Sequence, residues 1–477
     1  MSDPKPLVLD VDGTFLRTDM LFECFWAGLG KDPLAVLRVC ATHLTNRAVL
    51  KRELAEIAQL RTDLLPVNQH VADYAQAAQT DGREVILASA SDTPLVYAVA
   101  DHHGLSQRVF GSTPVRNLKG QAKADALVDA FGEAGFDYAG NEPVDRAIWD
   151  HSDGVIIVGD LPSEAASLQK SGHAVTELPG GWRKRDLLRA LRPHQWVKNA
   201  LLLVPLIASH AFTAEAALWV LLGIMAFSAA ASSIYVVNDL LDLEADRLHA
   251  TKHRRPFASG AVPIKIGMAT GFGLGAIALL LGLFIGWAFL AVVALYMTLS
   301  LAYSLRLKRL RWVDIATLAS LYTLRVVAGA MAVDVYVSGY LLVFIFPTFV
   351  SLGCVKRLTE VTLAKDDQRL PGRGYGRLDR GDLLNVAVLG AFASVLIYVL
   401  YSFSDHAMSL YPTRWLLWVS AIPLALWLTR MVWLGYTGKQ DYDPIVFAMR
   451  DKQGLGLIMI MLAIMFYAAG LWQVWVG

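Results

Sequence analysis

The sequence predicts two domains, a soluble α/β domain followed by an all-α membrane bundle. Hydrophobic residues make up 55% of the 477-residue chain and charged residues only 18%, whereas roughly 25% of residues are charged in an average soluble domain. Short apolar runs alternate with polar helical stretches up to residue 180, and long apolar stretches follow from residue 200. The first pattern is typical of a parallel sheet covered by helices, and the second is typical of membrane spans.

The first domain, residues 1–180, contains four apolar runs that we expect to be strands of one parallel sheet: 7–9, 85–88, 136–139 and 155–158. Residues 15–80 have a helical pattern without strand-like runs. We interpret this block as a helical cap, inserted after the first strand and lying over a site. The N-terminus lacks the features of a signal peptide, so we expect this domain in the cytoplasm.

The second domain, residues 200–477, is predicted to be a bundle of nine membrane spans: 200–213, 215–238, 263–285, 287–305, 313–333, 338–355, 383–404, 415–436 and 454–476. Four loops contain nearly all of its Lys and Arg residues, namely 239–262, 306–312, 356–382 and 437–453. This distribution predicts that these loops lie on the cytoplasmic side of a bacterial-type inner membrane and that the C-terminus lies outside. The basic linker, residues 181–199, is partly amphipathic and is expected at the membrane surface.

The charge and the cysteine content exclude other classes of function. The formal net charge is +1 and there is no basic tail, so a nucleic-acid partner is not expected. The three cysteines, Cys24, Cys40 and Cys354, have neither metal-binding nor disulfide spacing. We interpret them as small buried apolar residues, so redox chemistry is not expected.

The first candidate site follows the first expected strand. Asp10 and Asp12 lie at its C-terminal end, with Thr14 two residues further on, and ligands of open α/β sheets bind at that edge. A carboxylate can accept a phosphoryl group when a cation neutralises charge and a second carboxyl group handles the leaving-group proton. Asp10 and Asp12 fit these two roles, although taken alone the pattern is also a turn signal.

Three later stretches supply the other groups that this chemistry needs. Ser89 offers a hydroxyl to a phosphate, and Lys119 and Lys123 offer cations to it. Asn141 and Asp145 offer oxygen ligands to a metal. With the first motif these stretches resemble the four motifs of the haloacid dehalogenase-like phosphatases, which have a Rossmann-like α/β fold with a helical cap. The resemblance covers residues 6–175.

The resemblance implies a role for each matching residue. Asp10 would be the nucleophile and Asp12 the general acid/base, with Mg²⁺ bound by Asp10, the Asp12 carbonyl and the acid of the fourth motif. Phosphate would be bound by Thr14, Ser89 and either Lys119 or Lys123. The family usually has an acid where this chain has Asn141, so we expect reduced metal affinity and take Asp145 as the acid. Gly159-Asp160 is a rival position for this motif, and a decayed structural domain is the alternative to an active phosphatase.

The second candidate site lies where the second expected span ends. Its oxygen-bearing side chains are predicted to share one helical face: Asn238, Asp239, Asp242 and Asp246. Carboxylates that face one another there repel unless a divalent cation joins them, and such oxygen ligands favour Mg²⁺ shared with substrate phosphates. Because Lys252 and Arg255 follow, we expect a diphosphate substrate.

A second cluster opens the fifth expected span. Asp314, Tyr322 and Arg325 form one helical stripe, and an arginine inside a span is costly and normally faces a polar cavity. Arg430 lies nearer the end of its span and is expected to snorkel to the surface. Other residues near this side could bind phosphate, although loop topology explains each equally well: Tyr303, Lys308, Lys356, Arg357 and Glu360.

The spans and the acidic run resemble the UbiA superfamily of intramembrane prenyltransferases over residues 190–477. The stretches 192–199, 232–239 and 356–360, with the Asp314 stripe, look most like decaprenyl-phosphate phosphoribosyltransferases. Those members use phosphoribosyl diphosphate as donor and a polyprenyl phosphate as acceptor. Leu318 stands where aromatic prenyltransferases have a second acid, which weakens a quinone-type interpretation.

This resemblance implies that Mg²⁺ bound by Asp239, Asp242 and Asp246 holds the leaving diphosphate. It further implies that four basic residues neutralise the phosphates of donor or lipid: Lys198, Lys252, Arg255 and Arg325.

Together the two halves predict a bifunctional membrane enzyme. It would transfer a 5-phosphoribosyl unit to a polyprenyl phosphate and then remove the 5-phosphate, giving polyprenyl-phosphoryl ribose for an envelope polysaccharide. One alternative is prenyl transfer from a prenyl diphosphate to an aromatic or lipid acceptor, with a separate phosphatase activity. The other is a non-catalytic scaffold that binds phosphorylated metabolites, which the intact pair of Asp10 and Asp12 argues against.

Overall fold

The computed structural model describes residues 4–335, 338–364, 369–370, 373–440 and 443–472. The chain forms two compact units. The first consists of Met1–Leu191 with Tyr235–Gly271, and the second of Arg192–Ile234 with Phe272–Gly477. The first unit therefore contains not only the predicted soluble domain but also a segment from the predicted membrane domain.

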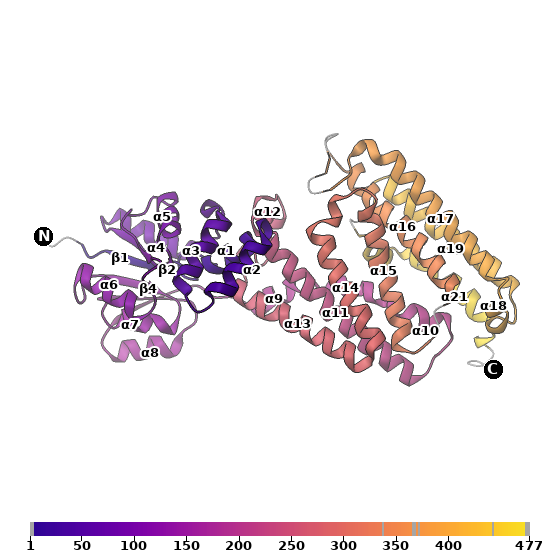
Figure 1. Ribbon diagram of the computed structural model, residues 1–477, viewed down its shortest axis with the longest axis horizontal. Coiled ribbons are helices and arrows are strands. Elements are labelled where there is room, and N and C mark those ends of the chain that lie inside the picture. Colours follow the sequence, from indigo (N-terminus) through magenta and orange to yellow (C-terminus); the bar gives the residue numbers. More distant parts are fainter. Residues whose placement is uncertain (1–3, 336–337, 365–368, 371–372, 441–442, 473–477) are drawn as a thin grey trace. The chain divides into compact units, whose positions relative to one another are not determined.

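The first unit is built on a six-stranded parallel sheet in the order β3-β2-β1-β4-β5-β6. Figure 1 labels β1, β2 and β4 of this sheet. The strands are β1 (Leu7–Asp10), β2 (Val85–Asp92), β3 (Phe110–Ser112), β4 (Asp137–Gly140), β5 (Gly154–Val158) and β6 (Ala174–Leu178). The four expected strands are confirmed. The sequence did not reveal β3, which has only three residues, or β6, which is largely exposed.

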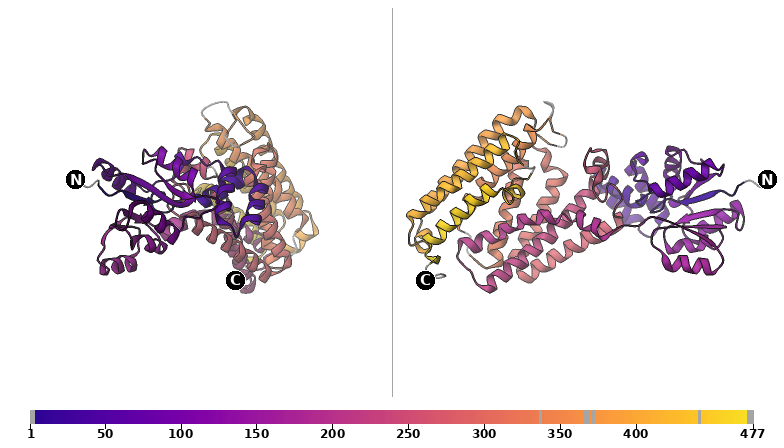
Figure 2. Two further views of the ribbon diagram at one scale, coloured as in Figure 1. Left: turned by 60° about the vertical axis from the view of Figure 1, so that its left-hand side comes forward. Right: turned by 180° about the vertical axis from the view of Figure 1, so that it is seen from behind.

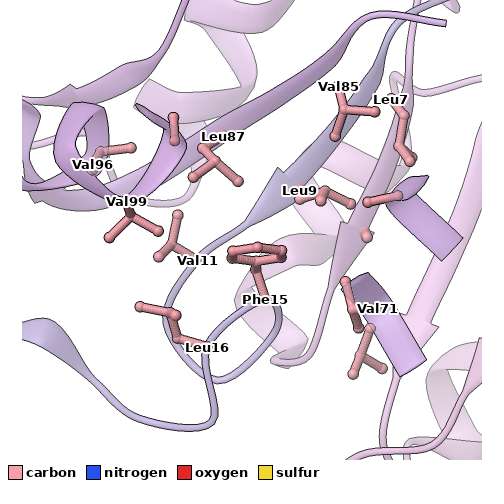
Figure 3. Packing of buried hydrophobic residues seen from close by; sticks show 14 of the residues in the cluster. Leu7, Leu9, Val11, Phe15, Leu16, Val71, Val85, Leu87, Val96 and Val99 are labelled. Atoms are coloured by element: carbon pink, nitrogen blue, oxygen red, sulfur yellow. The ribbon is translucent and has the colours of Figure 1, made fainter. Parts of the chain in front are cut away.

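Alternate residues of the strands bury opposite faces of the sheet, because successive side chains of a strand point to opposite sides. Leu7 and Leu9 pack with α4 (Gln69–Thr80) and α5 (Thr93–His102) on one face (Figure 3). Val8 packs on the other face with three helices: α6 (Gln121–Phe131), α7 (Arg146–Trp149) and α8 (Pro162–Lys170). The first unit is therefore a three-layer α/β structure whose strands are apolar on both sides.

Three helices, α1 (Met20–Lys31), α2 (Pro33–His43) and α3 (Arg47–Ala58), lie within the region predicted to be a cap, and we refer to these three helices as the cap. Side chains of Asp19, Asp32 and Asn46 accept hydrogen bonds from the first backbone N–H groups of these helices. The predicted cap of residues 15–80 is too wide, because α4 and Phe15 belong to the core that covers the sheet. The prediction extended too far because a helical pattern does not show what a helix packs against.

The segment from the membrane half packs on the cap. It comprises the end of α11 (Ala214–Leu241), α12 (Leu243–Leu248), a 3₁₀ turn (Lys252–Arg254) and the start of α13 (Ile264–Ile285). An apolar cluster joins it to α1 and to α9 (Lys184–Ala190): Trp26, Ala190, Val236, Leu240, Leu243, Phe257, Val262 and Ile264. Beside this cluster Arg247 forms an ion pair with Glu23, whose side chain is 1% exposed.

The described residues contain seven helices that are long and apolar enough to cross a membrane. They are α11, α13, α14 (Trp287–Leu305), α15 (Val313–Ala332), α16 (Gly339–Thr362), Arg377–Tyr401 with α17 (Arg380–Tyr401), and α19 (Trp415–Tyr436). Shorter helices are α10 (Val204–Ala208), α18 (Asp405–Leu410), α20 (Pro444–Ala448) and α21 (Lys452–Ala468). Figure 2 shows α16, α17, α19 and α21 side by side.

The prediction of nine spans is not confirmed. Residues 200–213 form the end of a 3₁₀ helix (Pro193–Leu203), the five-residue α10 and a stretch without helix at 209–213, so they contain no helix of spanning length. At the other end α21 has 17 residues, below the length of the seven helices, and 473–477 lie outside the described residues. Apolar composition alone does not separate short helices from spans.

Close backbone packing in the second unit predicts a sensitive glycine. A Cβ atom on Gly329 of α15 would lie 2.1 Å from the carbonyl oxygen of Leu202. We expect Gly329→Ala to push the backbones apart and to lower the free energy of unfolding by about 1–3 kcal/mol, measured as a fall in Tm of the detergent-solubilised protein. Gly273→Ala on α13 is the control, because no atom lies within 4 Å of its Cβ position. An equal Tm for both variants would contradict this packing.

Candidate active sites

Asp10 ends β1 at the edge of the sheet and is the centre of a buried polar network. Lys123 of α6 donates hydrogen bonds to the Asp10 carboxylate and to the Tyr138 hydroxyl, both at 2.7 Å. The Thr14 hydroxyl lies 3.4 Å from Asp10 and 3.0 Å from the side-chain oxygen of Asn141. The first and fourth predicted motifs and Lys123 therefore meet around one carboxylate.

Three hydrogen bonds orient the carboxylate of Asp12. One of its oxygens accepts the hydroxyls of Ser89 at 2.7 Å and Ser91 at 2.9 Å, and the other accepts the backbone N–H of Met20 at 2.8 Å. Met20 is the first residue of α1. Asp12 is thus held between β2 and the beginning of the cap. The sequence pointed to Ser89 but missed Ser91, which follows it on the same face of the strand.

The fourth motif lies beside Asp10 because β4 pairs with β1. The Asp145 carboxylate accepts the Tyr138 hydroxyl and the backbone N–H groups of residues 141 and 142, and it lies 3.9 Å from Lys123. A Cβ atom on Gly13 would lie 2.4 Å from the Asn141 amide nitrogen, so that amide packs on the β1 loop. The rival position at Gly159-Asp160 follows β5, which lies on the far side of β4 from β1.

The network concentrates negative charge where little solvent reaches. Burial raises the pKa of Asp10 to about 7, with Asp145 and Asp12 adding to the increase while Lys123 opposes it. Burial lowers the pKa of Lys123, but Asp10 and Asp145 outweigh it and leave that pKa above its ordinary value. A site with more carboxylates than cations is suited to a further cation.

The donor set fits Mg²⁺ in its chemistry. Asp10, Asn141 and Asp145 offer the oxygen ligands that this ion prefers, although backbone N–H groups already occupy one Asp145 oxygen. In the described part of the chain no three His, Cys, Asp or Glu side chains form a preassembled metal site. A metal at this site would therefore need the Asn141 amide or substrate oxygens as additional ligands.

The cap supplies a lysine that the sequence did not indicate. Lys51 of α3 donates hydrogen bonds to the Ala90 carbonyl at 2.5 Å and to the Asn117 side chain at 3.0 Å. Burial lowers its pKa, while Asp12 and Asp19 act in the opposite direction. Lys119, by contrast, is exposed. Of the two lysines that the sequence offered, the structure brings Lys123 to Asp10.

The acidic run after α11 adopts a different shape from the one predicted. The expected helical face over 238–246 is wrong, because α11 ends at Leu241 and Asp242 is the N-cap position of α12, with φ −101° and ψ 14°. Arg255 contacts Asp239 at 3.1 Å and Asp246 at 2.6 Å. The break in the helix therefore does not separate these two carboxylates.

The acidic run also fits a hard cation. The buried side-chain oxygen of Asn238 has no hydrogen-bond partner in the described structure, and it belongs to the same run as Asp239 and Asp246. Burial raises the pKa of Asp246, and Arg255 opposes this increase. Lys252 is exposed. These oxygens could take a divalent cation, with Arg255 left to contact a phosphate.

In the second unit, the predicted stripe divides into two clusters. Arg325 is 4% exposed and donates to the Asn199 side chain, the Leu321 carbonyl and the Tyr296 hydroxyl at 2.7–3.0 Å, with the Tyr322 ring alongside. These three hydrogen-bond acceptors are neutral, so an anionic ligand would suit this buried cation.

Asp314 belongs to the other cluster. It forms a bidentate ion pair with Arg357, and both side chains are fully buried. Arg357 also contacts Glu360 at 2.6 Å and the Tyr303 hydroxyl at 2.8 Å. With two carboxylates on one guanidinium, Arg357 is better placed to hold α15 and α16 together than to bind phosphate alone.

Two further predictions concern charged residues that turn out to be paired. Lys198 forms an ion pair with Asp443, and Lys356 lies 3.9 Å from the same carboxylate. Burial alone would raise the pKa of the Asp443 carboxyl, but the positive charges of Lys198 and Lys356 outweigh it and lower this pKa to about 2. Arg430, which we expected to snorkel, forms a bidentate pair with Asp451 at 2.7 and 2.9 Å. No motif indicated either aspartate.

The chain matches the model of the UbiA prenyltransferase family over residues 200–451. It therefore belongs to this family and is an integral membrane transferase. It is 33% identical over 460 residues to the uncharacterized protein y4nM of Sinorhizobium fredii, a match that covers 94% of this chain and 88% of that protein.

Two further matches each cover somewhat more than half of the chain. The decaprenyl-phosphate phosphoribosyltransferase of Corynebacterium glutamicum is 33% identical over 279 residues, covering 56% of this chain and 81% of the relative. The structure of a UbiA homolog from Archaeoglobus fulgidus bound to GPP and Mg²⁺ has a TM-score of 0.45 and 15% identity, covering 60% of this chain and 99% of that one.

The ion pair between the cap and the acidic segment predicts a large loss of stability on mutation. Arg247 contacts both oxygens of Glu23, which also accepts the Thr18 hydroxyl at 2.6 Å. Glu23→Gln leaves Arg247 charged and buried, so we expect a loss of about 3–5 kcal/mol, measured as a fall in Tm.

The control is Asp63→Asn, which removes an exposed pair with Arg61 and should change the Tm little. The double variant Glu23→Gln, Arg247→Gln should recover part of the loss. A Tm for Glu23→Gln equal to that of the control would show that the pair does not join the two segments.

Proposed function

We propose that the membrane domain transfers a 5-phosphoribosyl unit from phosphoribosyl diphosphate to a polyprenyl phosphate. The N-terminal domain, a haloacid dehalogenase-like phosphatase, then removes the 5-phosphate to give polyprenyl-phosphoryl ribose. The observation that carries the proposal is the meeting of Asp10, Asp12 and Lys123 at the end of β1 in a chain of the UbiA family. Relatives named decaprenyl-phosphate phosphoribosyltransferase support the choice of donor and acceptor.

In the transfer step, an oxygen of the lipid phosphate attacks the anomeric carbon of the ribose as the bond to the diphosphate breaks. This step needs positioning and charge neutralisation more than an acid or base. Mg²⁺ held by Asp239, Asp242 and Asp246 would neutralise the leaving diphosphate. Arg255 and the buried Arg325 are suited to phosphate oxygens of donor or lipid.

In the second step, the Asp10 carboxylate attacks the phosphorus of the 5-phosphate, and the bond to the ribose oxygen breaks. Asp12 gives its proton to that oxygen and later takes one from the water that hydrolyses the aspartyl phosphate. Lys123 and Ser89 are placed to stabilise phosphoryl oxygens, and Mg²⁺ would supply further neutralisation. The N-terminal domain acts on the cytoplasmic side of the inner membrane, and the product serves as a glycosyl donor for the cell envelope.

Replacing the nucleophile should separate the two steps. With ribose-labelled phosphoribosyl diphosphate, polyprenyl phosphate and Mg²⁺, reconstituted wild type should give a lipid-soluble product without its 5-phosphate. Asp10→Asn should stop at the lipid-linked 5-phosphoribose, with phosphate release reduced by at least about 10³-fold. Lys123→Ala should behave like Asp10→Asn, and Lys119→Ala like wild type. Equal phosphate release from wild type and Asp10→Asn would eliminate the phosphatase assignment.

Removing a carboxylate of the acidic run should abolish transfer itself. Asp242→Ala is expected to lose most lipid-soluble label, because the diphosphate would depart without charge neutralisation. Glu244→Gln is the matched control on the same segment and should retain transfer. If wild type labels lipid only with a labelled prenyl diphosphate as donor, the phosphoribosyl donor is excluded and prenyl transfer takes its place.

A further inference from the structure

Helix α2 has an apolar face that is exposed among the residues that the structure describes. Leu34 is 76% exposed and Leu37 is 57% exposed, and Leu44, directly after the helix, is 71% exposed. With Ala41, also exposed, these residues are spaced by three, four and three positions and so form one stripe along the helix.

The opposite face of α2 packs in the apolar core of the cap. Val36 and Val39 are buried in a cluster with Cys24 of α1 and Leu54 of α3. The exposed stripe is therefore not needed to hold the cap together. An 11-residue helix that is apolar on two faces is unusual unless a second surface covers the outer one.

The position of α2 in the chain brings it to the end of a membrane span. A Cβ atom on Gly30, near the end of α1, would lie 3.9 Å from the carbonyl oxygen of Leu241, the last residue of α11. Pro33 begins α2 only three residues later. Because α11 is one of the spanning helices, α2 begins where the bilayer surface is expected.

The charges around the stripe favour an anionic surface. Lys31, Arg38 and Arg47 are exposed around α2, and Asp32, which caps the helix, is the only acid between residues 31 and 47. Basic side chains beside an apolar stripe are the pattern of helices that lie in the headgroup region of anionic bilayers.

We propose that the Leu34, Leu37, Ala41 and Leu44 face of α2 lies in the headgroup region of an anionic bilayer and docks the cap on the membrane. Lys51 of α3 in the same cap donates to the carbonyl of Ala90, which lies between the two serines that bond to Asp12. Because the cap thus adjoins this site, docking would favour a membrane-bound phosphate ester over a soluble one. This consequence rests on the proposed function, whereas the docking itself does not.

The test uses the full-length chain in nanodiscs of phosphatidylcholine and phosphatidylglycerol that contain a doxyl-labelled lipid as quencher. Leu37→Cys, in a Cys40→Ala background, is labelled with an environment-sensitive fluorophore, since Cys24 and Cys354 are buried. The matched control is Val115→Cys, on an apolar residue of the same unit that is 95% exposed. We expect lipid quenching at position 37 and none at position 115, with weaker quenching at 37 in discs of phosphatidylcholine alone.

Each other outcome overturns the proposal. Absence of quenching at 37 removes the lipid contact, and equal quenching at both positions removes its specificity for α2. Equal quenching in both lipid mixtures removes the anionic preference. If the label at position 37 is protected from the quencher in discs that hold several chains but is quenched in discs that hold one chain, the face would be assigned to a second copy of the chain. Since neither enzymatic activity is measured, these results are independent of the proposed function.

Discussion

The packing of α1 against the acidic segment of the membrane half is the constraint on which the structure depends. Trp26 and the apolar residues around it are removed from solvent, and Glu23 and Arg247 are buried as an ion pair beside them. Separating α1 from the acidic segment would expose this apolar surface to water and would leave Glu23 and Arg247 without their partners. Each of these two changes costs free energy. The segment that bears Asp239, Asp242 and Asp246 is therefore part of the same compact unit as the sheet.

This constraint relates the two candidate sites physically. The N-terminal end of α1 donates a backbone hydrogen bond to Asp12, and Glu23 one turn further on contacts Arg247 of α12. Asp246, the neighbour of Arg247, contacts Arg255 together with Asp239. Both sites use the same electrostatic arrangement, in which buried carboxylates share one cation. Such groups are suited to phosphate substrates with a divalent cation, which is the chemistry common to both proposed steps.

The sequence was most informative where local pattern and structure coincide. The strands at 7–9, 85–88, 136–139 and 155–158 are buried on both faces, so their apolar runs predict them, and the motifs at Asp10 and Lys123 lie at the positions that parallel strands bring together. The pattern failed where the outcome depended on tertiary contacts. Lys51 meets Asn117 from 66 residues away, and nothing near either residue indicates this contact.

Two errors have a common physical origin. A four-residue spacing predicts one helical face for 238–246, but Asp242 leaves helical geometry and starts a new helix. Apolar composition predicts nine spans, but residues 200–213 contain only the end of a 3₁₀ helix and the five-residue α10. In both cases a pattern of residue types was extended across a break in the helix. Caps and prolines are visible in a sequence, but whether the chain turns at them depends on what each side packs against.

Native-state hydrogen exchange of the wild-type protein in lipid tests the central claim most directly. If the acidic segment and the cap form one cooperative unit, amides of α12 and of α1 should become exposed in the same opening event, with equal free energies and equal denaturant dependence. Opening of α12 at clearly lower free energy than α1 would contradict the claim, because the acidic segment would then move independently of the cap and the sheet domain.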